Sequence, residues 1–308
     1  MRVFVTGGTG FVGPAIVREL VASGHDVTVM VHKTRGSLDG EPGVRFHEGD
    51  VFEPSTFAKA VHGHDAIVHL LGLRRAFPGQ GRTFEKFHVL GTKNVLEAAR
   101  EAGARRFLFM SASSVRPDGA TYQRTKWQAE ELVKASRLDW TIFRPTFITG
   151  RKEDKAEGFD QEMARLVKAP LWPSFAGGRF LVQPVAKRDV ARAFAKALMG
   201  TIAIEKTYFL AGPDTFTWDN YLRALGKLLG KDHPLAPVPK WVALPAAGLF
   251  EGFKWFPASQ EELAMLFEGH SGNAAQAELE LGLKWTPWEE AAREALGLPA
   301  AGERASLR

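Results

Sequence analysis

The chain contains no cysteine, which excludes disulfides, thiolate zinc sites and cysteine nucleophiles. It also has little that resembles a leader or an anchor. Four glycines before residue 14 interrupt the apolar N-terminal stretch, which lacks a basic start. We therefore expect neither a secretion signal nor a membrane-spanning helix, and we place the protein in the cytoplasm. Serine-hydrolase and P-loop motifs are absent too, so the sequence favours neither a hydrolase nor a kinase.

An excess of one charge is another feature that the sequence lacks. The 40 basic residues are interleaved with 35 acidic ones, giving a net charge of +5. A nucleic-acid-binding chain would gather its basic residues on one stripe, so we expect no nucleic-acid partner. His62 and His64 flank a glycine in an expected surface turn without neighbouring ligands, and we expect no metal site.

Apolar runs alternate with amphipathic segments through the first half of the chain. The expected strands are 1–5, 27–31, 44–48, 66–71, 106–110 and 140–143. The expected helices between them are 14–23, 55–61, 83–102 and 121–136. Strands and helices that alternate at this rhythm predict an α/β fold, a doubly wound parallel Rossmann sheet.

The second half is organised differently, because prolines and tryptophans become frequent and helical segments dominate. We expect residues 1–150 to form the dinucleotide-binding domain, with returns to its sheet from about 180–212. A smaller, mostly helical C-terminal cap is expected from 151–179 and 213–298. Residues 299–308 read as a flexible tail.

A glycine-rich turn follows the first strand directly and precedes the first helix. The motif TGGTGFVG places Gly7, Gly10 and Gly13 three residues apart, with Phe11 and Val12 between the last two. Glycines allow a tight turn and a close approach of the backbone to phosphate, while the helix N-terminus attracts the anion. In this strand-turn-helix context the motif predicts binding of the pyrophosphate of NAD(H) or NADP(H).

The end of the second strand indicates which dinucleotide is preferred. NAD sites carry an acidic residue there that binds the adenosine ribose. This chain has His32, Lys33 and Arg35 instead, which suit the 2′-phosphate of NADP. We expect NADP, while NAD and a solvated basic loop remain open alternatives.

The motif TGGTGFVG, the pair Tyr122-x-x-x-Lys126 and the helix GTKNVLEAA resemble the extended and atypical short-chain dehydrogenase/reductases. Within them the chain is most similar to the branch of the NAD-dependent epimerase/dehydratase-like proteins and the complex I accessory subunit. The resemblance implies an adenine site at Asp50 and Val51. It implies further cofactor contacts at Leu71, Gly72, Pro145 and Phe147, and at Lys126.

The same resemblance implies a catalytic pair. Tyr122 would transfer a proton, while Lys126 would lower the pKa of its phenol and bind the nicotinamide ribose. The family's third residue is a serine or threonine, but Ala112 stands at that place. Ser111 or Ser113 is the candidate substitute. His88 also stands where the family commonly has an asparagine.

Two functions remain open at this stage. The first is an enzyme, an NAD(P)-dependent oxidoreductase or epimerase/dehydratase that acts on a small molecule, either apolar or a sugar nucleotide. The second is a non-catalytic NADP(H)-binding accessory subunit of a larger, membrane-associated respiratory complex. The apolar, aromatic segment 238–257 is too short and proline-broken to span a bilayer. It predicts a cap over the substrate, a peripheral membrane contact or a protein interface.

Overall fold

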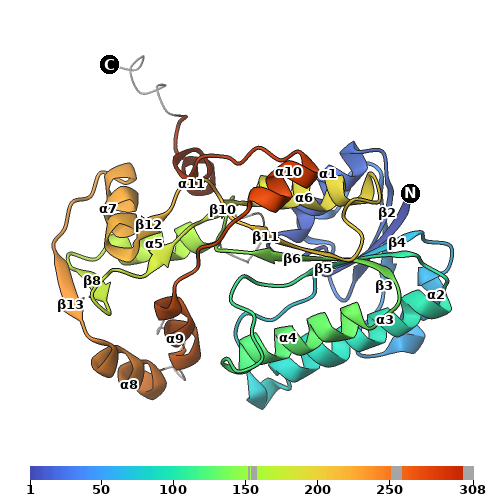
Figure 1. Cartoon of the computed structure of the whole chain (residues 1–308), viewed down its shortest axis with the longest axis horizontal. Coiled ribbons are helices and arrows are strands. Elements are labelled where there is room, and N and C mark those ends of the chain that lie inside the picture. Colours follow the sequence, from blue (N-terminus) through green and yellow to red (C-terminus); the bar gives the residue numbers. More distant parts are fainter. Residues whose placement is uncertain (152, 154–157, 251–258, 301–308) are drawn as a thin grey trace.

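A seven-stranded parallel sheet organises the protein, as a computed structural model shows (Figure 1). The structure describes residues 1–151, 153, 158–250 and 259–300. In spatial order the strands are β11 (Lys206–Leu210), β6 (Asp139–Pro145), β5 (Arg106–Met110), β4 (Ala66–His69), β1 (Arg2–Thr6), β2 (Asp26–Val31) and β3 (Val44–Glu48). The chain order reverses between β1 and β4, which confirms the predicted doubly wound Rossmann sheet.

Helices cover both faces of this sheet (Figure 1). One layer consists of α1 (Gly13–Ala22), α6 (Lys187–Leu198) and α10 (Ala275–Leu281). The other consists of α2 (Ala58–Val61), α3 (Gly91–Glu101) and α4 (Thr121–Lys134). Helix α6 packs on α1, so the segment from about 180 to 212 supplies both a helix and the edge strand β11 to this domain.

The alternation of side chains along each strand divides the core into these two layers. Val3 and Val5 are fully buried on the α1 side, whereas Phe4 between them is buried on the α3 side. Successive strand side chains point to opposite faces, so a strand covered on both sides must be apolar throughout. This explains why continuous apolar runs predicted β1, β2, β4 and β5, whereas the partly exposed edge strand β3 alternates apolar and polar residues.

A second group of elements forms the cap, on the left of Figure 1. Its helices are α5 (Phe159–Val167), α7 (Trp218–Leu228), α8 (Lys240–Phe250), α9 (Gln260–Glu268) and α11 (Trp288–Leu296). Its short strand pairs are β7 (Ile148–Thr149) with β10 (Val185–Ala186), β8 (Trp172–Phe175) with β13 (Leu235–Val238), and β9 (Leu181–Val182) with β12 (Phe216–Thr217). Helices dominate this C-terminal part, as predicted, although α10, which lies within the expected cap range 213–298, packs on α6 and β11 of the sheet domain.

A buried carboxylate joins several cap elements. Asp160 of α5 accepts hydrogen bonds from the Tyr221 hydroxyl and the Trp288 indole N–H, each at 2.9 Å, and from the Thr149 hydroxyl. Burial raises the pKa of Asp160. Since unpaired buried polar groups are costly, this carboxylate fixes how α5, α7 and α11 meet.

The expected helix 83–102 differs from the observed one. Residues Glu85–Leu90 form a π-helix, and the regular helix α3 begins only at Gly91. The wider turn places His88 inside the protein, where its ring bonds Leu73 and Thr125. These partners are distant in sequence, so periodicity alone could not predict the irregular turn.

Parts of three expected segments lie outside the described residues. These are 152 and 154–157 at the start of the cap, 251–257 of the apolar segment 238–257, and 301–308 of the expected tail. Within the described ranges no helix is both long and apolar enough to cross a membrane.

Candidate functional site

The glycine turn between β1 and α1 has three glycines with different roles. Gly7 has φ +73°, and a β-carbon there would lie 2.7 Å from the Leu71 backbone nitrogen. A β-carbon at Gly13 would overlap the Gly8 carbonyl oxygen. At Gly10 the nearest atom to such a carbon is the Gly7 carbonyl oxygen, at 3.3 Å, with nothing else within contact distance. Two glycines are therefore required by the fold itself, while Gly10 leaves open space above the backbone.

This open space fits a dinucleotide pyrophosphate. It lies at the N-terminus of α1, where backbone N–H groups lack partners within the helix and the helix dipole favours an anion. Val12 is the N-terminal cap residue, without a side-chain cap, and Pro14 follows in the first turn. The Phe11 ring lies beside the turn, 5.0 Å from the Lys187 ammonium.

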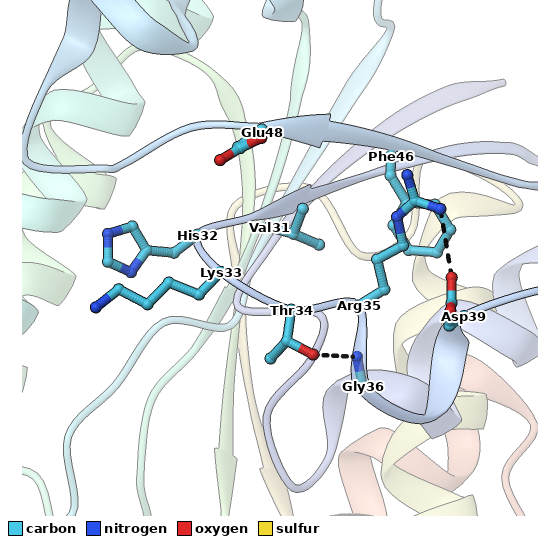
Figure 2. A pocket seen from close by; sticks show the side chains of 9 residues that line it. All are labelled: Val31, His32, Lys33, Thr34, Arg35, Gly36, Asp39, Phe46 and Glu48. Carbon is cyan, nitrogen blue, oxygen red and sulfur yellow. Dashed lines mark hydrogen bonds and ion pairs between the residues drawn. The ribbon is translucent and has the colours of Figure 1, made fainter.

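A cavity of about 520 Å³ lies at the end of β2 (Figure 2). His32, Lys33, Thr34 and Arg35 line it from β2 onward, and Phe46 and Glu48 line it from β3. Figure 2 shows His32 and Lys33 pointing to one side and Arg35 to the other. The Arg35 guanidinium stacks 4.8 Å from the Phe46 ring centre and pairs with Asp39 at 3.3 Å. Lys33 is thus the more available cation of the two.

The expected adenine site is adjacent to this cavity. One Asp50 oxygen accepts from the Phe52 N–H at 2.9 Å, and the other lies 3.6 Å from His32 Nε2. Asn94 of α3 donates to the Val51 carbonyl at 2.8 Å, fixing the backbone there. The loop geometry therefore presents the Asp50 carboxylate next to the basic loop, whereas the Val51 side chain is buried in the core.

The end of β4 brings the cofactor turn and the expected catalytic lysine together. Leu71 lies against Gly7, and a β-carbon on the exposed Gly72 would lie 3.3 Å from the Lys126 ammonium. Lys126 is buried and donates to the Met110 carbonyl at 2.9 Å. Burial lowers its pKa to about 8, while Glu130 opposes the shift. The lysine thus lies where the ends of β4 and β5 meet.

Tyr122 lies one helical turn before Lys126 on α4. Its ring makes edge contacts with Phe84 and His88, at centre distances of 5.6 and 5.2 Å. Burial raises the pKa of its phenol to about 12, and the positive charge of Arg74 acts in the opposite direction. Among the described residues no group hydrogen-bonds the hydroxyl, which is therefore available to another molecule.

The three residues after β5 include the position where the family has its third catalytic residue, a serine or threonine. Ser111 is buried and donates to Glu130, which also binds Arg144 through two nitrogens. The Ser113 hydroxyl lies 3.1 Å from His270 Nδ1 of the cap region. Ala112 between them has no hydroxyl. Both expected substitutes are thus engaged elsewhere in this structure.

The expected nicotinamide-side residues lie at the boundary with the cap. Pro145 is buried, and its carbonyl accepts from the Ser113 N–H at 3.0 Å. The Phe147 ring stacks on Phe159 at 4.1 Å and lies 4.4 Å from His270. Burial lowers the pKa of His270 to about 4. Phe147 thus forms an aromatic, uncharged wall with cap residues.

His88, the departure from the family's asparagine, is a structural link beside the site. Its Nε2 lies 3.2 Å from the Leu73 nitrogen and its Nδ1 lies 2.9 Å from the Thr125 hydroxyl. Burial lowers its pKa far below the usual range, so the ring is neutral and uses one nitrogen as donor and one as acceptor. It holds the loop after β4 against the helix that carries Tyr122.

Two residues at this site were not singled out from the sequence. Arg74 stood out only as one of an adjacent basic pair, and Glu130 follows Lys126 by four residues without any recognised motif. The spacing of Glu130 could have indicated a partner on the same helical face. Nothing local could have indicated the partners of Arg74, because they lie in the cap, Glu162 and Glu262.

Comparison with known proteins places this geometry among nucleotide-binding chains. A family model described as NAD(P)H-binding matches residues 7–199. An uncharacterised Mycobacterium tuberculosis protein is 28% identical over 238 residues, 77% of this chain, and the chain spans only 24% of that relative. The 40 kDa subunit of the Neurospora crassa NADH-ubiquinone oxidoreductase is 25% identical, over 82% of this chain and 67% of the subunit. The Caulobacter vibrioides ceramide reductase is 27% identical, over 80% of this chain and 74% of the reductase.

Solved structures show the same architecture along nearly the whole chain. The crystal structure of gox2253 superimposes with a TM-score of 0.78 and 26% identity, covering 96% of this chain and 97% of that one. The Thermus thermophilus UDP-glucose 4-epimerase, solved in complex with NAD, superimposes with a TM-score of 0.73 and 21% identity, covering 96% and 98%. The second likeness concerns the fold alone.

Proposed function

The chain belongs to the NAD(P)H-binding family, and from this premise we propose that it is an NADP(H)-dependent oxidoreductase that uses Tyr122 and Lys126. The observation that carries the proposal is the Tyr122 hydroxyl without a partner among the described residues, one helical turn from a buried lysine at the strand ends. When bound, the nicotinamide would supply or accept a hydride. The phenol would give or take the proton on the substrate oxygen.

Lys126 has a second role in this proposal. Its ammonium, now bonded to the Met110 carbonyl, lies within reach of the Gly72 backbone that borders the cofactor turn. A ribose hydroxyl bound there would share this donor. Buried Glu130, which opposes the lowering of the lysine pKa, would keep the ammonium charged.

We propose an apolar carbonyl compound as the substrate class. Support comes from the aromatic wall of Phe147 and Phe159, and from two cations of α6 that ion pairs already engage. Lys187 pairs with Glu153, and Arg188 pairs with Glu290 and Glu294. These pairs leave less positive charge for a sugar nucleotide. The Caulobacter relative, named as a ceramide reductase, acts on a compound of the apolar kind.

A second candidate function is an accessory cofactor-binding subunit. It is favoured by Ala112 at the usual hydroxyl position and by the Neurospora relative. The exposed side chains Trp241, at 78%, and Leu249, at 72%, on α8 would then contact another protein or a membrane surface. Both candidates share the cofactor site, so dinucleotide binding alone does not distinguish them.

The cofactor part of the proposal is tested by calorimetric titration with NADPH and NADH. We expect NADPH to bind more tightly, because Lys33 lines the cavity where a 2′-phosphate would lie. Lys33→Ala should weaken NADPH binding about ten-fold, or about 1.4 kcal/mol, with NADH unaffected. Arg35→Ala should have the smaller effect, since Arg35 is already paired with Asp39.

Lys227→Ala in α7 of the cap is the matched control, because it removes the same charge from an exposed cap position. Equal affinity for both dinucleotides, or equal losses in the Lys33 and Lys227 variants, would contradict the NADP preference.

A further inference from the structure

Arg74 lies in the loop after β4, two residues beyond Gly72. The preceding residue Leu73 is bonded through its backbone to His88, whose ring contacts Tyr122. Gly72, one residue earlier, borders the Lys126 ammonium. The loop is therefore held by His88 at Leu73 and borders Lys126 at Gly72. Arg74 is the next residue along the chain.

Two adjacent residues of α9 connect Arg74 with the Tyr122 end of α4. Glu261 accepts from the backbone N–H of Thr121, the residue before Tyr122. Glu262 lies 3.9 Å from Arg74 Nε. Two adjacent residues of α9 thus contact Arg74 and the residue before Tyr122. Arg74 and Tyr122 therefore lie at the same end of the site.

The cap holds the Arg74 guanidinium firmly. Glu162 of α5 contacts both terminal nitrogens, Nη1 at 2.8 Å and Nη2 at 2.5 Å. A guanidinium has five N–H donors in a rigid fork, and the two-point contact with Glu162 uses only part of them. The side chain is 63% exposed, so the remaining donors are accessible to another molecule.

The positions expected to supply the family's hydroxyl leave none free among the described residues. Ala112 has no hydroxyl, Ser111 is committed to Glu130, and Ser113 lies against His270. Carbonyl chemistry requires a donor directed at the oxygen on which negative charge develops. Among these residues no free hydroxyl fills the role of the family's third catalytic residue. Arg74 lies nearby and has N–H donors that Glu162 does not use.

We propose that Arg74 takes the place of the missing serine or threonine, binding the substrate oxygen and stabilising the charge that develops there and on Tyr122. The inference rests on the proposed oxidoreductase function. During reduction the carbonyl carbon receives a hydride from the reduced nicotinamide, and the C=O π electrons move to the oxygen. The oxygen then takes the phenolic proton, leaving a tyrosinate next to the guanidinium.

The charge distribution around Tyr122 supports this role. The ionisable groups near Arg74 and Tyr122 come from several elements: Arg74 from the loop after β4, Lys126 on α4, His88 on the π-helix, Glu162 on α5, and Glu261 and Glu262 on α9. His88 is neutral, and Lys126 donates to the Met110 carbonyl. Arg74 is the group whose charge lowers the pKa of the phenol against the effect of burial.

The direct test is the ionisation of Tyr122 itself. The chain has only 3 tyrosines, so labelling with 3-fluorotyrosine gives few ¹⁹F NMR signals, and Tyr122→Phe assigns one of them. Fluorination also makes the phenol more acidic, which brings the titration into a milder pH range. Arg74→Gln should shift the Tyr122 titration to higher pH, and Arg74→Lys should restore much of the shift.

Arg116→Gln is the matched control, because Arg116 also pairs with α9, through Glu268 at 2.6 Å. It should leave the titration unchanged. A titration that is the same in the wild type and in Arg74→Gln would overturn the proposal. An equal shift in the Arg116 variant would overturn it as well, since the effect would then come from a loosened α9.

A kinetic measurement separates this proposal from the function on which it rests. Single-turnover reduction of 9,10-phenanthrenequinone by NADPH should fall about 10²–10³-fold in Arg74→Gln, with NADPH affinity unchanged and partial recovery in Arg74→Lys. An unchanged rate in Arg74→Gln would overturn the role of Arg74. A wild-type protein that binds NADPH but leaves the quinone unreduced would count against the oxidoreductase proposal, and the NMR titration would still decide whether Arg74 acts on Tyr122.

Discussion

Gly10 and Gly13 lie in the same turn, but packing within the protein requires a glycine only at Gly13. Gly13 is packed against the Gly8 carbonyl, so any β-carbon there would force the turn and α1 apart. Gly10 has a negative φ and open space above it, so the fold tolerates a side chain. The same backbone motif thus combines a glycine needed for folding with a glycine needed for a ligand.

We expect Gly10→Val to abolish dinucleotide binding while the protein stays folded, because the isopropyl group would fill the space meant for the pyrophosphate. Gly13→Ala should instead destabilise the protein strongly through its overlap with Gly8. Fluorescence titration with NADPH and thermal unfolding of both variants provide the check. Normal NADPH affinity in a folded Gly10→Val protein would show that the dinucleotide binds elsewhere.

The positions of the expected cofactor residues in the fold were largely predictable from residues close in sequence. The glycine turn, the basic residues after β2 and Asp50 all follow the ends of strands that apolar runs had located. The catalytic side was less predictable, because its partners come from distant segments. Ser111 meets Glu130, Ser113 meets His270 and Arg74 meets Glu162, and no local pattern encodes such pairs.

At the scale of elements, His69 of β4 links two parts of the nucleotide-binding domain. Its Nδ1 lies 2.6 Å from the Thr6 hydroxyl of β1, and its Nε2 lies 3.1 Å from the Thr92 hydroxyl of α3. The ring is fully buried, and burial lowers its pKa from 6.5 to about 3. A neutral histidine therefore joins sheet and helix next to the cofactor turn.

This histidine should make the domain sensitive to acid. The folded state keeps the ring neutral, whereas the unfolded chain takes up a proton below its pKa of 6.5. The contribution of His69 to the free energy of unfolding is thus fully present above pH 6.5, and it is lost as the pH drops toward about 3. At about pH 5 the loss should be about 2 kcal/mol for this residue. Urea unfolding at about pH 7 and pH 5 measures it.

His69→Gln, which can still bond both threonines, should reduce the loss of stability between the two pH values. His62→Gln changes an exposed histidine and should leave the loss unchanged. The same pH dependence in all three proteins would contradict the assignment of acid sensitivity to His69.

The irregular π-helix before α3 is the element that sequence periodicity described least well. Apolar spacing predicted one continuous helix from 83 to 102, but the π-helix buries His88 and leaves the apolar Leu90 exposed. The irregularity depends on His88 reaching the backbone at Leu73 and the hydroxyl of Thr125. It therefore arises from tertiary contacts, at the place where the loop carrying Arg74 is fixed.

At the scale of the whole molecule, the sheet domain and the cap meet through charged groups at the mouth of the site. Arg74 binds Glu162 and Glu262, and Arg116 binds Glu268. These contacts tie the cap helices α5 and α9 to the sheet domain near Tyr122. An accessory subunit would need the cofactor site but not this arrangement around the phenol.

The transfer of deuterium from labelled NADPH tests the account most directly. The protein is incubated with NADPH deuterated at the nicotinamide C4 and with an apolar metabolite extract, and mass spectrometry follows the label. We predict deuterium in a reduced product with the wild type and none above background with Tyr122→Phe. NADPH affinity should stay unchanged in the variant, since no described group hydrogen-bonds the hydroxyl that it removes. Label transfer that is equal in both proteins, or absent from a wild type that binds NADPH, would contradict the account.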